Sequence, residues 1–334
     1  MKYRWEQQAD TRQKGGKICQ NRKFFVILRT DSSGRIAMET KTNSKKVALV
    51  LASGGARGMA HIGAIEELQA RGYEITSIAG ASIGAMIAGM YAAGKLEEAK
   101  AWFLQIDKQR ILQMGDLSLS LNHVVKGEKV INELKKVVPD CQIEDLNIPC
   151  SIVASDMVNS EEVVFEKGSL WEAIRASISI PLFFQPITRE KQVLIDGGIL
   201  NPLPLDRVRR KDGDILAAMN ISARDSMQVE EVKRPNLPKF LTEIPAVNKF
   251  LEDTHTTNLT PSVNYVSLLN RMTDMMIQHN TMLMTQLVHP DILAEMPQGA
   301  YSTFAFDQTS ELIEHGRRLM REAIDRYEKS TVCG

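Results

Sequence analysis

The sequence has no excess of charge of either sign. It contains 41 Lys and Arg residues and 41 Asp and Glu residues among 334, so its formal net charge is zero. Binding to nucleic acid depends largely on an excess of Lys and Arg that neutralises phosphates, so we expect no nucleic-acid partner. Hydrophobic residues make up 43% and charged residues 25% of the chain, which is typical of a globular protein.

Cysteine is scarce, and its spacing is unlike that of a metal or redox site. The four cysteines are Cys19, Cys141, Cys150 and Cys333, and no two of them form a CxxC pair. Zinc sites and thioredoxin-like redox sites usually depend on such pairs. A few cysteines scattered over a long chain are typical of a protein from a reducing compartment, in which thiols stay free. We therefore expect no metal, and a cytoplasmic protein, either free or peripheral to a membrane.

Long uncharged runs are also lacking, with one exception. Residues 75–94 contain no Asp, Glu, Lys or Arg, a length that would span a membrane. The run includes four glycines, two serines and a threonine, which suit a buried strand, turn and helix better. The N-terminal residues lack the apolar core and the cleavage site of a signal peptide. We therefore expect no membrane-spanning segment.

Positive charge is concentrated at the beginning of the chain. Residues 1–46 hold twelve Lys and Arg residues and four acidic residues, a net charge of +8 that leaves −8 for the remainder. We expect residues 1–45 to form a basic, disordered tail, or an extension upstream of a start at Met38, and residues 46–330 to form the folded domain. A basic arm can contact anionic lipid, although such tails are usually only solvated.

The hydrophobic pattern becomes regular at Val47. The run VALVLAS is typical of a strand that is buried on both faces. After the glycine-rich SGGARG comes a helical pattern that ends at Gly72, a residue suited to a helix C-terminus. YEITSIAG predicts a second strand and IGAMIAGMYAAG a second helix. This alternation predicts an α/β fold with a mainly parallel central sheet that is flanked by helices.

Ser82 lies between the second strand and the second helix, within GASIG. A serine hydroxyl is a weak nucleophile unless it is held in place beside a base. The sharp turn of a nucleophile elbow supplies that position, and Gly80 and Gly84 allow the backbone segments to approach closely. The motif by itself is only a moderate signal, because glycine and serine are common in buried turns.

The loop SGGARG, residues 53–58, also joins a strand to a helix. Its backbone N–H groups are suited to binding an oxyanion. The alternative is a phosphate loop for a dinucleotide, which would require glycine at the position of Ser53 and an acidic residue at the end of the second strand. The second strand instead runs into Ala79 and Gly80, so we favour the oxyanion interpretation.

No histidine has the sequence context expected of the base that would activate Ser82. None of the four late histidines follows a strand in a recognisable loop, as an α/β-hydrolase would require, and His61 falls inside the first helix. The candidates are His61, His123, His255, His279, His289 and His315. Asp196 does follow a strand, in QVLIDGG, although Asp-Gly is also a common turn.

The motifs SGGARG, GASIG and DGG, in this order, resemble those of patatin-like phospholipases. Members of that family are lipid acyl hydrolases with a three-layer α/β/α fold and a Ser–Asp dyad that needs no catalytic histidine. The resemblance covers residues 46–326 and includes the segments 173–187 and 310–324, with departures at Ser53 and Leu182. It implies catalytic roles for Ser82 and Asp196, an oxyanion hole at Gly54, Gly55, Ala56 and Arg57, an elbow at Gly80 and Gly84, and a DGG turn at Gly197 and Gly198.

The resemblance also implies the hydrolysis of lipid carboxylic esters, as in phospholipase A or lysophospholipase. The reaction would pass through an acyl-enzyme intermediate and would need no cofactor. A carboxylate is a poor base for a hydroxyl at its usual pKa, so Asp196 should be desolvated. Two alternatives stay open. One is an α/β-hydrolase with a Ser–His–Asp triad, and the other is a non-catalytic lipid- or nucleotide-binding module.

Two segments are candidates to cover the active site. Residues 103–140 mix apolar and charged side chains. Residues 265–288 are rich in methionine at helical spacing, with the stripe Leu269, Met272, Met276, Leu283 and Leu287. Flexible methionines suit an acyl-chain or membrane-facing surface, but a stripe of this kind more often packs into a core. We therefore expect most of it to be buried.

Overall fold

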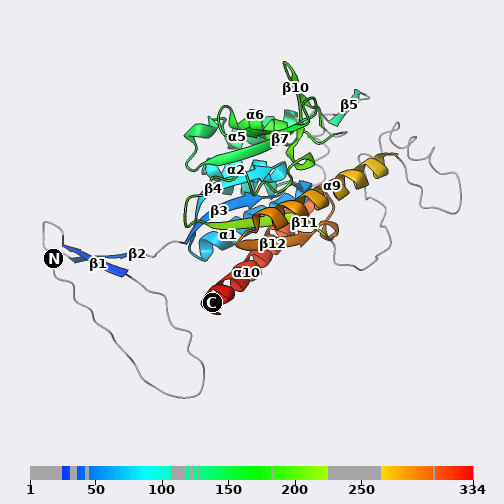
Figure 1. Cartoon of the computed structure of the whole chain (residues 1–334). Helices are drawn as coiled ribbons and strands as arrows, with labels where there is room; N and C mark the ends of the chain where they lie inside the picture. The colour runs from blue at the N-terminus through cyan, green and yellow to red at the C-terminus, as the bar shows by residue number, and fades with distance from the viewer. Residues whose placement is uncertain are drawn as a thin grey trace. The chain divides into compact units, whose positions relative to one another are not determined.

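The computed structural model describes residues 25–30, 36–41, 45–106, 117–120, 123–125, 128–181, 184–224, 265–303 and 305–333. The chain divides into two units, Met1–Ser44 and Lys45–Gly334. In the first unit, β1 (Phe25–Thr30) pairs antiparallel with β2 (Ile36–Lys41) (Figure 1). Our expectation of a disordered tail did not include this pair of strands.

The second unit is built on a mixed eight-stranded sheet with the order β12-β11-β3-β4-β7-β10-β9, and β8 pairs with β7. The parallel strands are β3 (Lys45–Leu51), β4 (Tyr73–Ala81), β7 (Cys150–Asp156), β11 (Ile215–Ala223) and β12 (Ile292–Pro297). The antiparallel strands are β8 (Glu161–Phe165), β9 (Ile187–Arg189) and β10 (Gln192–Asp196). The predicted α/β fold with a mainly parallel sheet is confirmed, with an antiparallel edge that the pattern did not reveal.

Helices flank this sheet and complete a three-layer α/β arrangement (Figure 1). The α-helices are α1 (Met59–Ala70), α2 (Ile83–Ala92), α3 (Leu96–Phe103), α5 (Glu128–Val137), α6 (Leu170–Ser177), α9 (Tyr265–Val288) and α10 (Thr309–Cys333). Short 3-10 turns are η1 (Gly55–Gly58), η2 (Ile143–Asp145), η3 (Gly197–Ile199), η4 (Gln298–Ala300) and η5 (Phe306–Gln308). A small hairpin joins β5 (Leu117–Ser120) to β6 (His123–Val125).

The uncharged run of residues 75–94 forms part of the protein core. It contains most of β4, the turn at Ser82 and the whole of α2, and the side chains of Ile78, Ile87 and Met90 are fully buried. The interpretation as a strand, a turn and a helix is therefore confirmed. Within the described part of the chain, every helix is too short or too polar to cross a bilayer.

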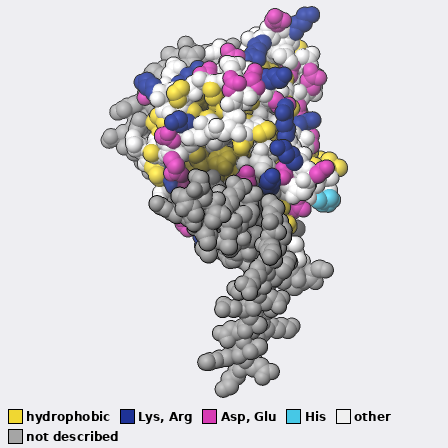
Figure 2. Space-filling model, turned by 90° about the vertical axis from the view of Figure 1, so that its left-hand side faces the viewer, with side chains coloured by type: hydrophobic (Ala, Val, Ile, Leu, Met, Phe, Trp, Pro, Cys, Tyr) yellow, Lys and Arg dark blue, Asp and Glu magenta, His cyan; other side chains and the backbone are white. Residues whose placement is uncertain are grey.

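The surface carries charges of both signs. On the face shown in Figure 2, Lys and Arg side chains are interspersed with Asp and Glu side chains around a group of hydrophobic ones. Many of the charges form ion pairs, such as Arg71 with Asp325 and Glu328. Mixed charge of this kind agrees with the zero net charge of the sequence.

Our expectation for the methionine-rich stripe of α9 is wrong. Met272, Met276, Leu283 and Leu287 are between 40% and 75% exposed. The core contacts come instead from the opposite side of the helix, through Thr281, Met284 and Val288. Helix α9 packs against β11 with one side only (Figure 1), so a second apolar stripe is left in solvent. Of the other candidate cover, residues 107–116 lie outside the described residues.

Helices α1 and α10 approach each other through two glycines. A Cβ atom at Gly63 would overlap the carbonyl oxygen of Ile313, and one at Gly316 would overlap that of Ala60. Backbone in direct contact with backbone has no side chain that can move aside. These positions therefore require glycine although each lies inside a helix.

Gly63→Ala should destabilise the protein by about 2 kcal/mol or more, although alanine is the better helix former by about 1 kcal/mol. Gly89→Ala in α2 is the matched control, because its Cβ would meet only the mobile ends of the Leu170 and Ile174 side chains. Urea unfolding should place the Gly63→Ala midpoint well below the Gly89→Ala midpoint. Equal midpoints would contradict the close helix contact.

Candidate active site

Ser82 occupies a strained turn between β4 and α2. Its backbone has φ 55° and ψ −125°, which is unusual for a residue with a side chain. The flanking glycines make this turn possible. A Cβ at Gly80 would overlap the backbone of Gly84, and one at Gly84 would overlap the carbonyl oxygen of Leu51. The geometry is that of a nucleophile elbow.

Ser82 and Asp196 are direct hydrogen-bond partners. The Ser82 hydroxyl donates to Oδ2 of Asp196 over 2.5 Å, and the Gly198 N–H donates to Oδ1 over 2.8 Å. Asp196 ends β10, which pairs with β7, and β7 lies beside β4. The sheet therefore joins two residues that are 114 positions apart. Ser82 is 3% and Asp196 4% exposed.

Three further serines hold this pair, and none of them was singled out from the sequence. The Ser177 hydroxyl accepts the Ser82 N–H over 2.8 Å and donates to the Val153 carbonyl over 2.6 Å. The carbonyl of Ser179 accepts the Asp196 N–H, and the Ser155 hydroxyl donates to the Asp196 carbonyl, each over 3.0 Å. The only sequence signal was the segment 173–187, which carries Ser177 and Ser179.

Burial changes the acidity of Asp196. Desolvation raises its pKa from the ordinary value of 3.8 to about 7, although the hydrogen bonds from Ser82 and Gly198 act in the opposite direction. A carboxylate with this pKa is a far better proton acceptor for a hydroxyl than an exposed one. The geometry and the acidity both suit a general base.

The three motifs lie against one another. In the glycine loop, Gly58 packs so closely on Ile83 that a Cβ would overlap that side chain. Gly198 of the DGG turn is equally close to the Ser53 hydroxyl. The glycine loop therefore touches both the residue after Ser82 and the turn that follows Asp196.

The glycine loop is tied to the segment that follows β12. The Ala56 N–H donates to the Thr303 carbonyl over 2.8 Å. We had expected this N–H to be free as an oxyanion donor, but it is engaged. The buried Arg57 side chain donates to the carbonyls of Gln298 and Tyr301 over 2.8 and 3.2 Å. Gly55, with φ 61°, lies directly against Thr303. Arg57 therefore braces the loop, and within the described chain no hydrogen bond joins the Gly54 or Gly55 N–H to another segment.

In the described structure, no histidine is hydrogen-bonded to the Ser82 side chain or to Asp196. His61 is fully buried, with Nε2 2.8 Å from the Ala52 carbonyl, and burial lowers its pKa to about 4, so it is neutral. His315 faces the Tyr301 hydroxyl, and His279 and His289 are exposed. The side chain of His123 and all of His255 lie outside the described residues.

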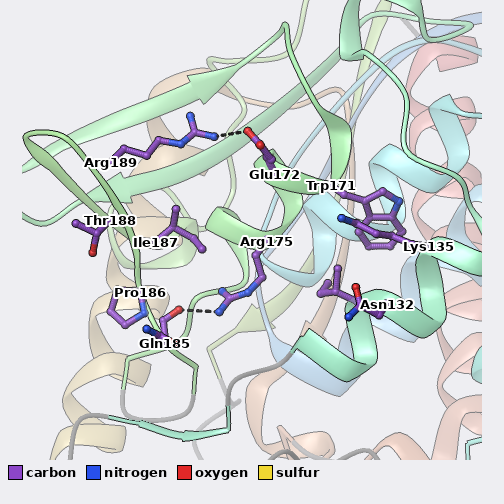
Figure 3. A pocket seen from close by; sticks show the side chains of 11 residues that line it. Asn132, Lys135, Trp171, Glu172, Arg175, Gln185, Pro186, Ile187, Thr188 and Arg189 are labelled. Carbon is purple, nitrogen blue, oxygen red and sulfur yellow. Dashed lines mark hydrogen bonds and ion pairs between the residues drawn. The ribbon is translucent and has the colours of Figure 1, made fainter.

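We also searched the described residues for a metal site and for a pocket beside Ser82 and Asp196. Among the residues that the structure describes, no group of three or more His, Cys, Asp or Glu side chains is arranged to hold a metal. A hollow of about 750 Å³ lies beside α5 and α6, where Arg175 donates to the Gln185 carbonyl and Arg189 pairs with Glu172 (Figure 3). Neither Ser82 nor Asp196 lines it.

Part of the chain is similar to a known protein family. Residues 49–209 match the family model for patatin-like phospholipases, and this segment includes the glycine loop, Ser82 and Asp196. Residues 49–209 of the chain therefore form a patatin-like phospholipase domain. The resemblance that we drew from three short motifs is thereby confirmed.

Two relatives are similar to this chain over more than half of its length. An uncharacterized NTE family protein of Mycobacterium tuberculosis is 39% identical over 196 residues, which is 59% of this chain and 54% of the relative. Patatin-like phospholipase domain-containing protein 6 of Homo sapiens is 32% identical over 54% of this chain and 14% of its own. The chain thus spans about half the length of the mycobacterial relative and a much smaller part of the human one. A crystal structure of VipD from Legionella pneumophila shows a weaker likeness, with a TM-score of 0.46 and 16% identity over 90% of this chain and 70% of VipD.

Asp196→Asn should stabilise the protein above pH 7. Because the folded pKa of about 7 exceeds the unfolded value, the stability that Asp196 contributes is fully present below about pH 4 and is lost as the pH rises to about 7. Above pH 7 a charged carboxylate is buried, and the neutral amide removes that cost, which is on the order of 4 kcal/mol.

Urea unfolding at pH 8 and at pH 5 measures this effect, and the advantage of the variant should shrink at the lower pH. Asp212→Asn is the matched control, because Asp212 also precedes a glycine but is exposed. An Asp196→Asn protein that is less stable than the parent at pH 8 would contradict the burial of a charge.

Proposed function

We propose that this protein is a serine acyl hydrolase that cleaves carboxylic ester bonds of lipids through a Ser82–Asp196 dyad. One observation carries the proposal, which is the buried hydrogen bond of 2.5 Å from the Ser82 hydroxyl to Oδ2 of Asp196. The family supports lipid ester hydrolysis in general. The dyad itself is our inference from the geometry.

In the first step, Asp196 takes the hydroxyl proton as Ser82 Oγ attacks the ester carbonyl. The Oγ–carbon bond forms and the carbonyl electrons move to the oxygen. Asp196 then returns its proton to the leaving alcohol as the ester C–O bond breaks. The acyl group is left on Ser82.

The negative oxygen of the tetrahedral intermediate needs hydrogen-bond donors. We assign this role to the Gly54 and Gly55 N–H groups, beside the N-terminus of α2 with its positive dipole end. Ala56 would join them only if the Thr303 carbonyl moved away, because that carbonyl accepts its N–H. Arg57 maintains the loop through the Gln298 and Tyr301 carbonyls.

In the second step, water releases the acyl group. Asp196 accepts a proton from water as the water oxygen attacks the acyl carbon, and it returns this proton to Ser82 Oγ as the acyl–enzyme bond breaks. The base is thus restored, and the sum of both steps is an ester plus water giving an acid and an alcohol. The chemistry assigned to these residues uses no cofactor.

The substrate class follows from the family and from the burial of the dyad. We propose glycerolipid or lysophospholipid esters, as in phospholipase A or lysophospholipase, handled by a cytoplasmic protein in transient contact with membranes. The free thiols of Cys141 and Cys150 fit that compartment. A triad is disfavoured because none of the hydrogen bonds described for Ser82 and Asp196 comes from a histidine.

Ser82→Ala should fold normally and lose turnover of a p-nitrophenyl acyl ester by about 10³-fold or more, because a nucleophile has no substitute. A fluorophosphonate probe, which reacts only with an activated serine, should label the parent but not this variant. Ser160→Ala is the matched control, since among the described residues Ser160 is the other serine with positive φ, at 56°. Retained turnover or labelling in Ser82→Ala would reject the nucleophile, and a parent that is not labelled would favour a non-catalytic binding module.

The pH profile and a histidine series together test the base. With Asp196 at a pKa of about 7, kcat/KM should fall as the pH drops through about 7, because the base becomes protonated. Replacement of each of the six histidines by glutamine should preserve both turnover and this limb, with His61→Gln the most harmful because His61 is buried beside Ala52. A folded histidine variant as inactive as Ser82→Ala would show that the enzyme uses a triad.

A further inference from the structure

Helix α9 exposes an apolar stripe that the fold does not use. Seven large apolar side chains are each between 40% and 75% exposed, namely Leu268, Met272, Met275, Met276, Met282, Leu283 and Leu287. At 100° per residue they fall within an arc of about 140°, opposite the core contacts of Thr281, Met284 and Val288. Exposed patches of contiguous apolar surface commonly mark interaction sites.

The helix carries little charge to oppose contact with an apolar phase. Arg271 and Asp274 are the only Lys, Arg, Asp or Glu residues among its 24. Asp274 accepts a hydrogen bond from the Gln298 side-chain amide and lies on the side of the core contacts, whereas the exposed Arg271 lies beside the stripe. A cation at the edge of an apolar stripe suits a surface that contains anionic lipid.

The stripe is connected to the active site through the fold. The side-chain amide of Asn280, in the middle of α9, lies 3.3 Å from the carbonyl oxygens of Ile199 and Leu200. Those residues directly follow the turn that carries Asp196 and Gly198. A lipid ester must reach a dyad that is almost fully buried, so a lipid-binding surface adjoining this turn would bring the site close to its substrate.

The composition of the stripe favours a fluid partner over a second copy of this chain. Four of the seven side chains are methionine, which is flexible and adapts to irregular surroundings. A helix–helix interface is more often built from leucine and β-branched residues that define one packing. The polar His279 and Gln286 also lie within the same arc, where a packed seam would bury them.

We propose that the exposed stripe of α9 is a lipid-surface docking site, which seats the protein on anionic membranes with the dyad near the interface. This inference rests on the proposed lipid hydrolase function. The helix would lie along the interface with its apolar side chains among the acyl chains. Its other side would stay packed on β11.

Vesicle sedimentation of the full chain tests the proposal, with phosphatidylcholine vesicles that do or do not contain phosphatidylglycerol. All proteins carry Ser82→Ala, so that no lipid is consumed. The parent should sediment with the vesicles, more strongly when phosphatidylglycerol is present. Adding Met272→Glu, Met275→Glu and Leu287→Glu together should weaken binding about 10-fold or more, because three charges enter the stripe.

Met157→Glu with Val158→Glu is the matched control, because these side chains are equally exposed in the turn between β7 and β8. It should bind vesicles like the parent. When Ser82 is left unchanged, the protein with the three α9 substitutions should turn over a soluble p-nitrophenyl ester at the parent rate. This shows that the fold and the dyad are intact.

Three results would overturn the docking site. The parent could stay in the supernatant with every vesicle, the α9 variant could bind as well as the parent, or the control could lose binding equally. If the parent ignores vesicles and sedimentation velocity shows a dimer that the α9 substitutions dissociate, the occupant is a second copy. A failure of the proposed Ser82–Asp196 dyad would be distinguishable from these results. In that case Ser82→Ala would keep its esterase activity, whether or not the protein binds vesicles.

Discussion

The hydrogen bond between Ser82 and Asp196 is the constraint on which the rest of the site depends. It joins the end of β4 to the end of β10 inside a region with almost no access to water. A buried carboxylate is costly unless its oxygens are satisfied. One oxygen accepts from Ser82 and the other from the Gly198 N–H. The same burial that makes Asp196 costly also raises its pKa towards neutrality and suits it to act as a base.

Close backbone contact is what allows this arrangement. Gly80 and Gly84 let β4 and α2 approach at the elbow, Gly198 lies on Ser53, and Gly58 lies on Ile83. At each of these points a side chain would overlap a neighbour. The glycines thus allow the three motifs to pack around a serine with an unfavourable backbone conformation. The Ser177 hydroxyl accepts the N–H of that serine, and the Ser179 carbonyl accepts the N–H of Asp196.

Two further features link this site to the C-terminal part of the chain. The segment after β12 holds the glycine loop through the carbonyls of Thr303, Gln298 and Tyr301. Helix α9 touches the turn after Asp196 through Asn280 and leaves its methionine-rich stripe in solvent. Both features lie beyond the residues that match the family model. The segment that matches the family model therefore supplies Ser82 and Asp196, and the C-terminal region shapes their surroundings.

The sequence by itself determined the alternation of strands and helices around Ser82, because runs such as VALVLAS and turns such as GASIG are local signals. It also determined the three motifs that identify the family, since their order is a property of the chain. Only the tertiary structure decided that Asp196 reaches Ser82, because this contact depends on the antiparallel pairing of β10 with β7. Likewise, the partner of the Ala56 N–H and the exposure of the α9 stripe depend on which distant segments pack against each residue. Periodicity shows that a helix has an apolar side, but the packing of the whole chain decides whether that side is covered.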